Sequence, residues 1–300
     1  MLLRWEREGG NASLAVKFSL GEQRRSAARQ AKEKIMNCKI CAQPCRPHGR
    51  ATLLGKYEIA YFQCASCGFV QTEPPYWLGE AYASAISSID IGVISRANDF
   101  GRLTRNLLLA AYDPNARFLD YGGGPGVFVR MMRDQGFDFY LYDKFCENMF
   151  ARGFEAEIDR PGHYALATAF EVFEHFVDPL AEIEALLHSS RSLLFSTLLL
   201  PPSSPPPGQW WYYALEHGQH VSIYTYPALA QIARRFGLRL LTNGRSLHLL
   251  TDQPISQRGF DLIFRRKISA LRNLWLARRQ RQRSLLEDDF KRGSGLTIVP

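Results

Sequence analysis

Residues 118–126 read FLDYGGGPG, and an apolar segment follows from Val127. The apolar run predicts a buried strand, the glycines predict a tight turn, and residues 127–133 predict the start of a helix. A strand–turn–helix of this kind places backbone N–H groups and a helix N-terminus against a ligand. Glycine is needed where the backbone must approach a ligand closely or adopt a positive φ. The stretch therefore predicts a ligand-binding turn in an α/β fold.

The acids beside this turn indicate which ligand it binds. The dinucleotide fingerprint G-x-G-x-x-G fits Gly122 and Gly124 but requires Gly or Ala where the chain has Val127. Asp120 would repel a pyrophosphate, whereas it suits an ammonium or sulfonium group. Asp143 ends the next apolar run, where an acid commonly binds ribose hydroxyls. Together these features suit S-adenosylmethionine; the alternative is a tight turn with incidental acids.

Residues 116–251 resemble the class I S-adenosylmethionine-dependent methyltransferases. Residues 120–126 resemble the D/E-x-G-x-G-x-G motif of that family. Residues 169–175 (AFEVFEH), followed by Asp178-Pro179, resemble the segment after its fourth strand. The resemblance implies a doubly wound, Rossmann-like seven-stranded α/β sheet that binds the cofactor at the carboxyl ends of its strands.

The same resemblance implies a set of cofactor-binding residues. They are Asp120, Tyr121, Gly122, Gly123, Gly124, Gly126, Asp143 and Glu171. In this arrangement Asp120 meets the methionine ammonium, and Asp143 meets the ribose. Apolar segments predict strands at residues 116–121, 138–143, 152–157, 164–170, 192–199 and 238–242, with an antiparallel end strand near residues 246–250.

Five of the six cysteines lie within residues 38–67. Four of them form two C-x-x-C pairs, a spacing that predicts a closed, structural Cys₄ zinc site in a zinc ribbon. The four predicted ligands are Cys38, Cys41, Cys64 and Cys67. Cys45 and His48 are alternative ligands with a less suitable spacing. Reduced structural cysteines or a redox pair are the other interpretations.

A cysteine ribbon that ends in C-x-x-C-G-x-x-Q and is joined by helices to such a domain resembles bacterial sugar C-methyltransferases and their relatives. In those enzymes the small domain helps to cover the substrate. We therefore expect five parts. They are an N-terminal arm (1–36), a zinc ribbon (37–75), a helical linker (76–113), an S-adenosylmethionine-binding domain (114–252) and a basic helical tail (253–300).

The catalytic residues are expected after the fifth strand. Histidine is the side chain best suited to accept a proton near neutral pH. His220 is the first candidate base because it aligns with a histidine of the sugar C-methyltransferases, and His217 and Glu216 are the next candidates. Gln219 stands where that family has a glutamate, which argues against methylation at carbon. His175 is expected to be architectural.

Four aromatic residues, WWYY at positions 210–213, follow a proline-rich loop. They suit a lid over the pocket and packing in the core equally well.

The net charge of +8 is concentrated near the C-terminus. Residues 265–292 hold ten Lys and Arg against three acids. Within this tail, Ile268, Leu271, Leu274 and Trp275 are at helical spacing, which predicts an amphipathic basic helix. Such a helix either docks on its own domain or contacts an anionic membrane surface peripherally. The absence of a long apolar run or a signal peptide predicts a cytoplasmic protein.

These patterns predict an S-adenosylmethionine-dependent methyltransferase that contains Zn²⁺ and acts on a small molecule, such as a sugar or a glycan end. An RNA methyltransferase that holds RNA with the ribbon and the tail is the second hypothesis. Nucleic acid is disfavoured because the ribbon is only mildly basic and residues 169–175 lack the N/D-P-P-Y/F motif used on nucleobase amines. A non-catalytic binding module is the third hypothesis, but such a module would have lost Asp120 or the glycines. The sequence leaves the oligomeric state open.

Overall fold

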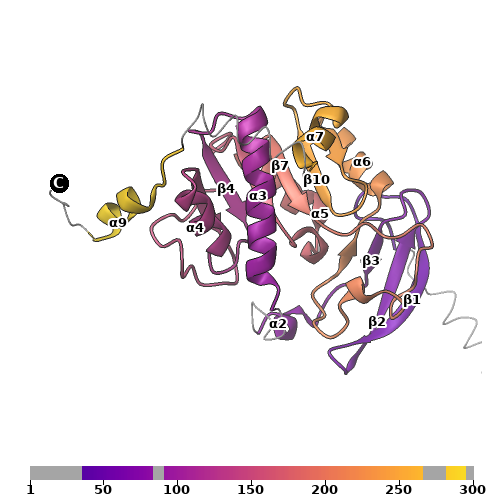
Figure 1. The fold of residues 1–300 in the computed structure, drawn as a ribbon. Helices are drawn as coiled ribbons and strands as arrows, with labels where there is room; N and C mark the ends of the chain where they lie inside the picture. The colour runs from indigo at the N-terminus through magenta and orange to yellow at the C-terminus, as the bar shows by residue number, and fades with distance from the viewer. Residues whose placement is uncertain (1–35, 84–90, 266–281, 295–300) are drawn as a thin grey trace, which may run out of the picture. The chain divides into compact units, whose positions relative to one another are not determined.

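The computed structural model describes residues 36–83, 91–265 and 282–294, and two β-sheets organise them (Figure 1). The larger sheet has six strands in the order β5-β4-β6-β7-β10-β9. Its strands are β4 (Arg117–Tyr121), β5 (Asp138–Tyr142), β6 (Leu166–Ala169), β7 (Ser192–Ser196), β9 (Arg239–Thr242) and β10 (Leu247–Thr251). Strands β5, β4, β6 and β7 are parallel, and β10 is antiparallel to both β7 and β9.

Helices cover both faces of this sheet, which explains why β4, β6, β7 and β10 are almost entirely buried. On one face, α3 (Val93–Ala111), α4 (Val127–Asp134) and α7 (Gln257–Phe264) pack on a core that includes Phe118 and Leu194. On the other face, α5 (Pro179–Ser189) and α6 (Tyr226–Arg235) pack on a core that includes Leu119 and Phe195. Neighbouring residues of one strand thus enter opposite cores, and the sheet is doubly wound as predicted.

The sheet differs from the prediction in two ways. Residues 152–157 do not form a seventh strand, because they meet β5 only at one bridge between Leu141 and Glu155. The pairing is confined to the Leu141 backbone, whose N–H donates to the Phe154 carbonyl and whose carbonyl accepts from the Ala156 N–H. The antiparallel strand is present but does not lie at the end of the sheet, since β10 is inserted between β7 and β9.

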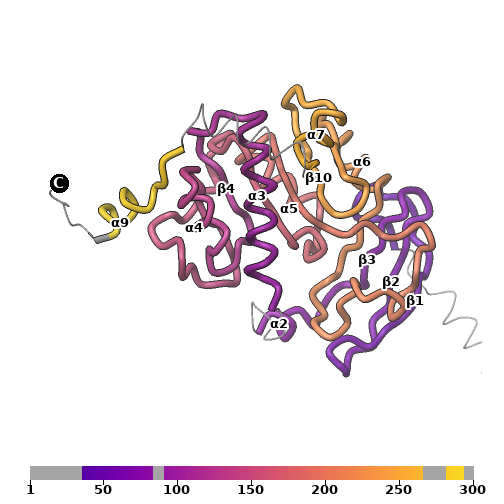
Figure 2. Tube along the Cα trace, viewed as in Figure 1, coloured from indigo at the N-terminus to yellow at the C-terminus, as the bar shows by residue number. Residues whose placement is uncertain are grey.

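The smaller sheet has the order β1-β2-β3-β8 and combines two distant parts of the chain (Figures 1 and 2). Strands β1 (Cys45–Leu53), β2 (Tyr57–Cys64) and β3 (Val70–Thr72) come from the cysteine-rich region. Strand β8 (Ser222–Ile223) follows β7 in the chain and pairs antiparallel with β3. Beside it, the Trp77 indole, just before the short helix α2 (Leu78–Ala81), donates a 2.7 Å hydrogen bond to the carbonyl of Gly218.

The described part of the tail docks on α4. Helix α9 (Leu286–Ser294) places Asp289 in a bidentate pair with Arg133, and their side chains are only 8% and 5% exposed. Gly136 allows the chain to pass closely, because a Cβ there would lie 2.5 Å from the Arg283 carbonyl oxygen. The apolar positions 268–275 lie outside the described residues. No helix within the described segments is long and apolar enough to span a membrane.

Candidate active site

The glycine turn between β4 and α4 has the backbone conformation that its sequence predicts. Gly122, Gly124 and Gly126 have φ values of +70°, +58° and +89°, and Gly126 is the N-cap of α4. A Cβ on Gly122 would lie 2.6 Å from the Val172 side chain. A Cβ on Gly123 would lie 2.1 Å from Asp120 Oδ2. The turn therefore needs glycine both for its φ values and for close packing.

Asp120 is the last but one residue of β4 and is 1% exposed. Its Oδ1 accepts a 2.7 Å hydrogen bond from the Thr168 hydroxyl, while Oδ2 has no partner among the described residues. Burial raises the pKa of this carboxyl to about 7. A buried carboxylate oxygen without a hydrogen-bond partner near the end of β4 fits a cationic ligand group, such as the ammonium predicted from the sequence.

Asp143 follows β5 and holds the turn in place. Its two oxygens accept 2.8 Å hydrogen bonds from the backbone N–H groups of Gly124, Phe145 and Cys146. Nearby, Glu182 of α5 accepts a 2.9 Å hydrogen bond from the Tyr121 hydroxyl. Asp143 thus lies where the prediction puts it, and it also fixes the loops on either side.

A cavity of about 870 Å³ joins these residues to the predicted catalytic ones. Its walls include every predicted cofactor-binding residue except Gly126, which caps α4 behind the turn. The lining also includes all three predicted catalytic residues, which are Glu216, His217 and His220. Residues far apart in the sequence therefore share one chamber, with room for a cofactor and a small second ligand.

Glu171 follows β6 and has a left-handed φ of +55°. Its backbone N–H donates to the Ser196 hydroxyl, which in turn donates to Glu171 Oε1. Burial, together with the neighbouring charge of Glu174, raises the pKa of Glu171. These two hydrogen bonds with Ser196, the last residue of β7, hold the Glu171 side chain at the cavity wall.

His220 has a defined tautomer. Its Nδ1 lies 2.6 Å from the carbonyl oxygen of Tyr212, which can only accept, so Nδ1 carries the proton and Nε2 carries the lone pair. Burial lowers the pKa of His220 to about 4, and the nearby Glu171 opposes this effect only in part. His220 is therefore neutral at neutral pH and is a weak base.

His175, which the sequence analysis expects to be architectural, also lines the cavity. It ends the short 3₁₀ helix η1 (Phe173–His175) and lies 5.1 Å from the His220 ring. Its Nδ1 is 2.9 Å from the Tyr82 hydroxyl. Glu174 in the same turn accepts a 2.7 Å hydrogen bond from Tyr212. Both residues belong to the sequence motif AFEVFEH. The motif alone does not show that Glu174 and His175 reach the cavity, whereas the 3₁₀ turn does.

The four consecutive aromatic residues divide between the two predicted roles. Tyr212 and Tyr213 belong to the short 3₁₀ helix η2 (Trp211–Tyr213) and are almost fully buried. Trp211 lines the cavity and is 74% exposed. A lid function thus remains available to Trp211 alone among these three residues.

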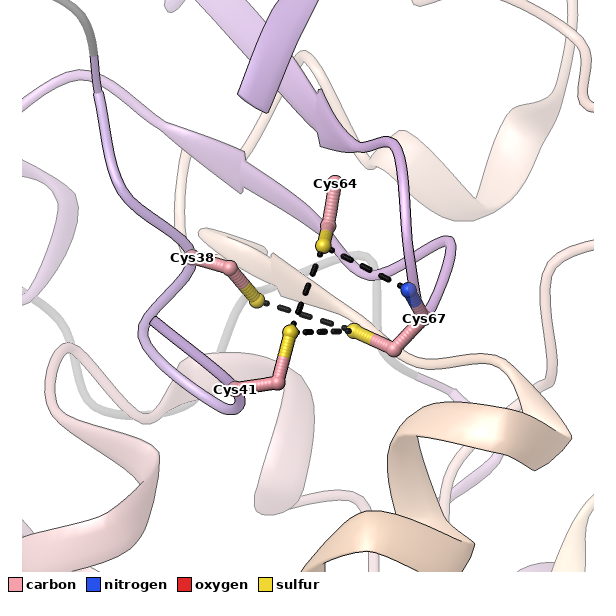
Figure 3. Close-up of side chains that lie close together, drawn as sticks. All are labelled: Cys38, Cys41, Cys64 and Cys67. Atoms are coloured by element: carbon pink, nitrogen blue, oxygen red, sulfur yellow. Dashed lines mark hydrogen bonds between the residues drawn. The ribbon is translucent and has the colours of Figure 1, made fainter. Parts of the chain in front are cut away.

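The four predicted zinc ligands come together at the base of the smaller sheet (Figure 3). The sulfur of Cys41 lies 3.4 Å from that of Cys64 and 3.6 Å from that of Cys67, and Cys38 and Cys67 are 3.6 Å apart. A tetrahedral site with zinc–sulfur bonds of about 2.3 Å requires sulfurs about 3.8 Å apart. The geometry therefore fits a Cys₄ metal site.

The two alternative ligands lie outside the group of four sulfurs. His48 lies 3.0 Å from the Tyr213 hydroxyl and 3.2 Å from the Pro205 carbonyl oxygen, outside the sulfur cluster. Cys45 is the first residue of β1, where it pairs with Cys64, and its sulfur does not belong to the group of four that lie within 4.8 Å of one another.

One protein-family model matches the part of the chain that carries most of this site. Residues 95–243 match the family model described as a methyltransferase domain, just under half of the chain. The match spans the glycine turn, Asp143, Glu171 and His220. No curated protein matches the chain in a sequence search.

Among the solved structures that match part of the chain, three are described as methyltransferases or contain one. A Burkholderia thailandensis 1,6-didemethyltoxoflavin-N1-methyltransferase, solved with S-adenosylhomocysteine, is 18% identical, covers 69% of this chain and 100% of its own, and has a TM-score of 0.42. A Haloferax volcanii complex of the Trm112 activator with a methyltransferase is 14% identical, covers 58% and 98%, and has a TM-score of 0.44. A Planctomyces limnophilus O-methyltransferase family 2 protein with apigenin is 14% identical, covers 58% and 65%, and has a TM-score of 0.40; the aligned part is thus less than two thirds of that protein.

Proposed function

We propose that this chain, an S-adenosylmethionine-dependent methyltransferase whose methyltransferase domain spans residues 95–243, methylates a small molecule such as a sugar or a glycan end. One observation carries the proposal. A single cavity of about 870 Å³ is lined both by the glycine turn and by polar and aromatic side chains from other parts of the chain. The exposed ring of Trp211 at its wall offers the apolar platform on which a sugar ring stacks.

We place S-adenosylmethionine against the glycine turn. The orphaned Oδ2 of Asp120 would accept from the methionine ammonium, and Asp143 would meet the ribose hydroxyls at the end of β5. Gly124 leaves room for the ligand, because a Cβ there would meet nothing within 4 Å. The bound cofactor supplies an activated methyl group, and the chain must align the acceptor and remove its proton.

For the proton acceptor we favour His217 over His220. The pKa of His220 is lowered to about 4 by burial, so protonating it is costly at the pH where the enzyme is expected to work. His217 lines the same wall, and Glu216 precedes it in the chain. His220 then helps to position the acceptor, and the Tyr212 carbonyl holds its ring in one tautomer.

We also propose that Cys38, Cys41, Cys64 and Cys67 bind one structural zinc ion. The support is the short sulfur–sulfur distances and the backbone N–H groups that point at the sulfurs, such as those of Ser66 and Cys67 at Cys64 Sγ. Because the ribbon shares a sheet with β8, the ion would stabilise the segment that carries the predicted catalytic residues.

Calorimetry with S-adenosylmethionine tests the proposal. Asp143→Ala should weaken binding at least about tenfold, because ribose contacts and the hold on the glycine turn are both lost. Asp159→Ala, an exposed acid in the loop after β5, is the matched control. Methyl-labelled cofactor incubated with the protein and a panel of sugars and nucleotide sugars should then yield a labelled sugar. Tight NADH binding without any response to S-adenosylmethionine would overturn the assignment.

A further inference from the structure

A second group of metal-ligating side chains lies in the cavity, separate from the four cysteines. One ring nitrogen each of His175 and His220 and one carboxylate oxygen of Glu174 lie within 4.8 Å of one another. Glu174 and His175 come from η1, and His220 comes from the segment before β8. All three line the cavity described above.

Hydrogen bonds orient each of these side chains from behind. The Nδ1 of His220 donates to the Tyr212 carbonyl, and the Nδ1 of His175 lies 2.9 Å from the Tyr82 hydroxyl. Glu174 Oε1 accepts from the Tyr212 hydroxyl. Histidines that bind metals commonly use one ring nitrogen for the ion and give the other to an oxygen in this way. The two Nε2 nitrogens and Glu174 Oε2 are therefore the available donors.

The second observation is an unsatisfied buried oxygen. The Glu174 side chain is fully buried, and its Oε2 has no hydrogen-bond partner among the described residues. A buried carboxylate oxygen without a partner is costly unless a cation or a donor meets it. The charged groups that act on this carboxylate include Arg96, and Glu171 is the second acid nearby. Glu171 and Glu174 thus bring two acids to the same cavity as the two histidines.

We propose that Glu174, His175 and His220 bind a divalent transition-metal ion that holds the methyl acceptor. Two imidazole nitrogens and one carboxylate oxygen suit Zn²⁺, Mn²⁺ or Fe²⁺, and three protein ligands leave coordination positions open for a substrate. This inference rests on the proposed methyltransferase function for its role, but the ion site itself depends only on the three side chains.

The ion would assist an acceptor that carries a hydroxyl group. A hydroxyl bound to a divalent cation loses its proton more readily than a free one. The proton passes to His217, the acceptor oxygen forms a bond to the methyl carbon, and the carbon–sulfur bond breaks with its electron pair left on sulfur. The products are a methyl ether and neutral S-adenosylhomocysteine. Because His220 gives its lone pair to the ion, it is not the base in this scheme.

Cobalt binding to the full-length, zinc-loaded protein tests the site. Added Co²⁺ should bind with about one further equivalent and show weak visible bands without thiolate charge transfer, as expected for nitrogen and oxygen ligands. His220→Ala and Glu174→Gln should each weaken this binding about 100-fold or more, and the Gln keeps an acceptor for Tyr212. His188→Ala, an exposed histidine on α5, is the control and should bind Co²⁺ like the unaltered protein.

The outcomes separate this site from the two other proposals. Co²⁺ binding that persists in both His220→Ala and Glu174→Gln would overturn the site, and so would Co²⁺ that enters only the cysteine cluster with strong thiolate bands. Melting curves identify a variant that fails to fold, and the other variant then decides. Calorimetry with S-adenosylmethionine is run on the same samples. A protein that binds Co²⁺ at this site but not the cofactor would refute the proposed function and leave the ion site standing.

Discussion

The docking of α9 on α4 predicts a large effect from one substitution, Asp289→Ala. The Asp289 carboxylate meets the Arg133 guanidinium at 2.7 and 2.8 Å and Arg130 at 2.9 Å. Removing one partner of a buried ion pair typically costs about 3–5 kcal/mol. Arg133 keeps Asp138 as a second partner, so we expect the free energy of unfolding to fall by about 2–3 kcal/mol.

Urea denaturation measures this difference. Asp288→Ala is the matched control, since Asp288 is the adjacent acid on the same helix but is exposed. Burial raises the pKa of Asp289, but its hydrogen bonds with Arg133 and Arg130 outweigh burial and lower the pKa overall. The pair therefore stabilises the fold above the ordinary range of an aspartate and loses this effect as the pH falls below it. Equal stability of Asp289→Ala and Asp288→Ala would refute the argument that the tail belongs to the folded core.

Three further predictions concern the site and the ribbon. Gly122→Ala should abolish cofactor binding in calorimetry, because its φ is +70° and a Cβ would lie 2.6 Å from Val172; binding within a factor of two of the unaltered protein would contradict this. The raised pKa of Asp120, about 7, means that stability should fall by about 3 kcal/mol as pH rises from 4 to 7, and Asp120→Asn should flatten this slope in denaturation curves. Cys64→Ser should lose about one zinc per chain by elemental analysis and melt at a lower temperature, whereas Cys146→Ser should do neither.

The sequence predicted the parts of the fold that depend on local pattern. The glycine turn, the two C-x-x-C knuckles and the strands of the larger sheet follow from glycine, cysteine and apolar spacing. The sequence wrongly predicted a strand at residues 152–157. The apolar residues of this segment are compatible both with the single bridge that is observed and with a full strand ladder. The pairing of β3 with β8 could not be predicted either, since β8 is only two residues long and its partner lies about 150 positions earlier in the chain.

The sequence predicted which residues line the candidate site better than it predicted which of them lie next to one another. Asp120, Asp143 and His220 were selected for their chemistry, and all three line the cavity. His175 was assigned to the architecture because a histidine inside a family motif resembles a packing residue. Only the turn of η1 shows that His175 and Glu174 face His220. Burial also reverses an argument from residue type, since a histidine chosen for its ordinary pKa becomes a poor base where its pKa falls to about 4.

Because β3 pairs with β8, the smaller sheet can be completed only late in synthesis at the ribosome. The ribbon strands β1 to β3 emerge early, but Val70 and Gln71 pair with Ile223 and Ser222, which emerge only after most of the larger sheet. Until then the outer edge of β3 presents unpaired backbone groups to other nascent chains. Early zinc binding by the cysteines would hold β1 to β3 in a compact ribbon until β8 is synthesised and covers this edge.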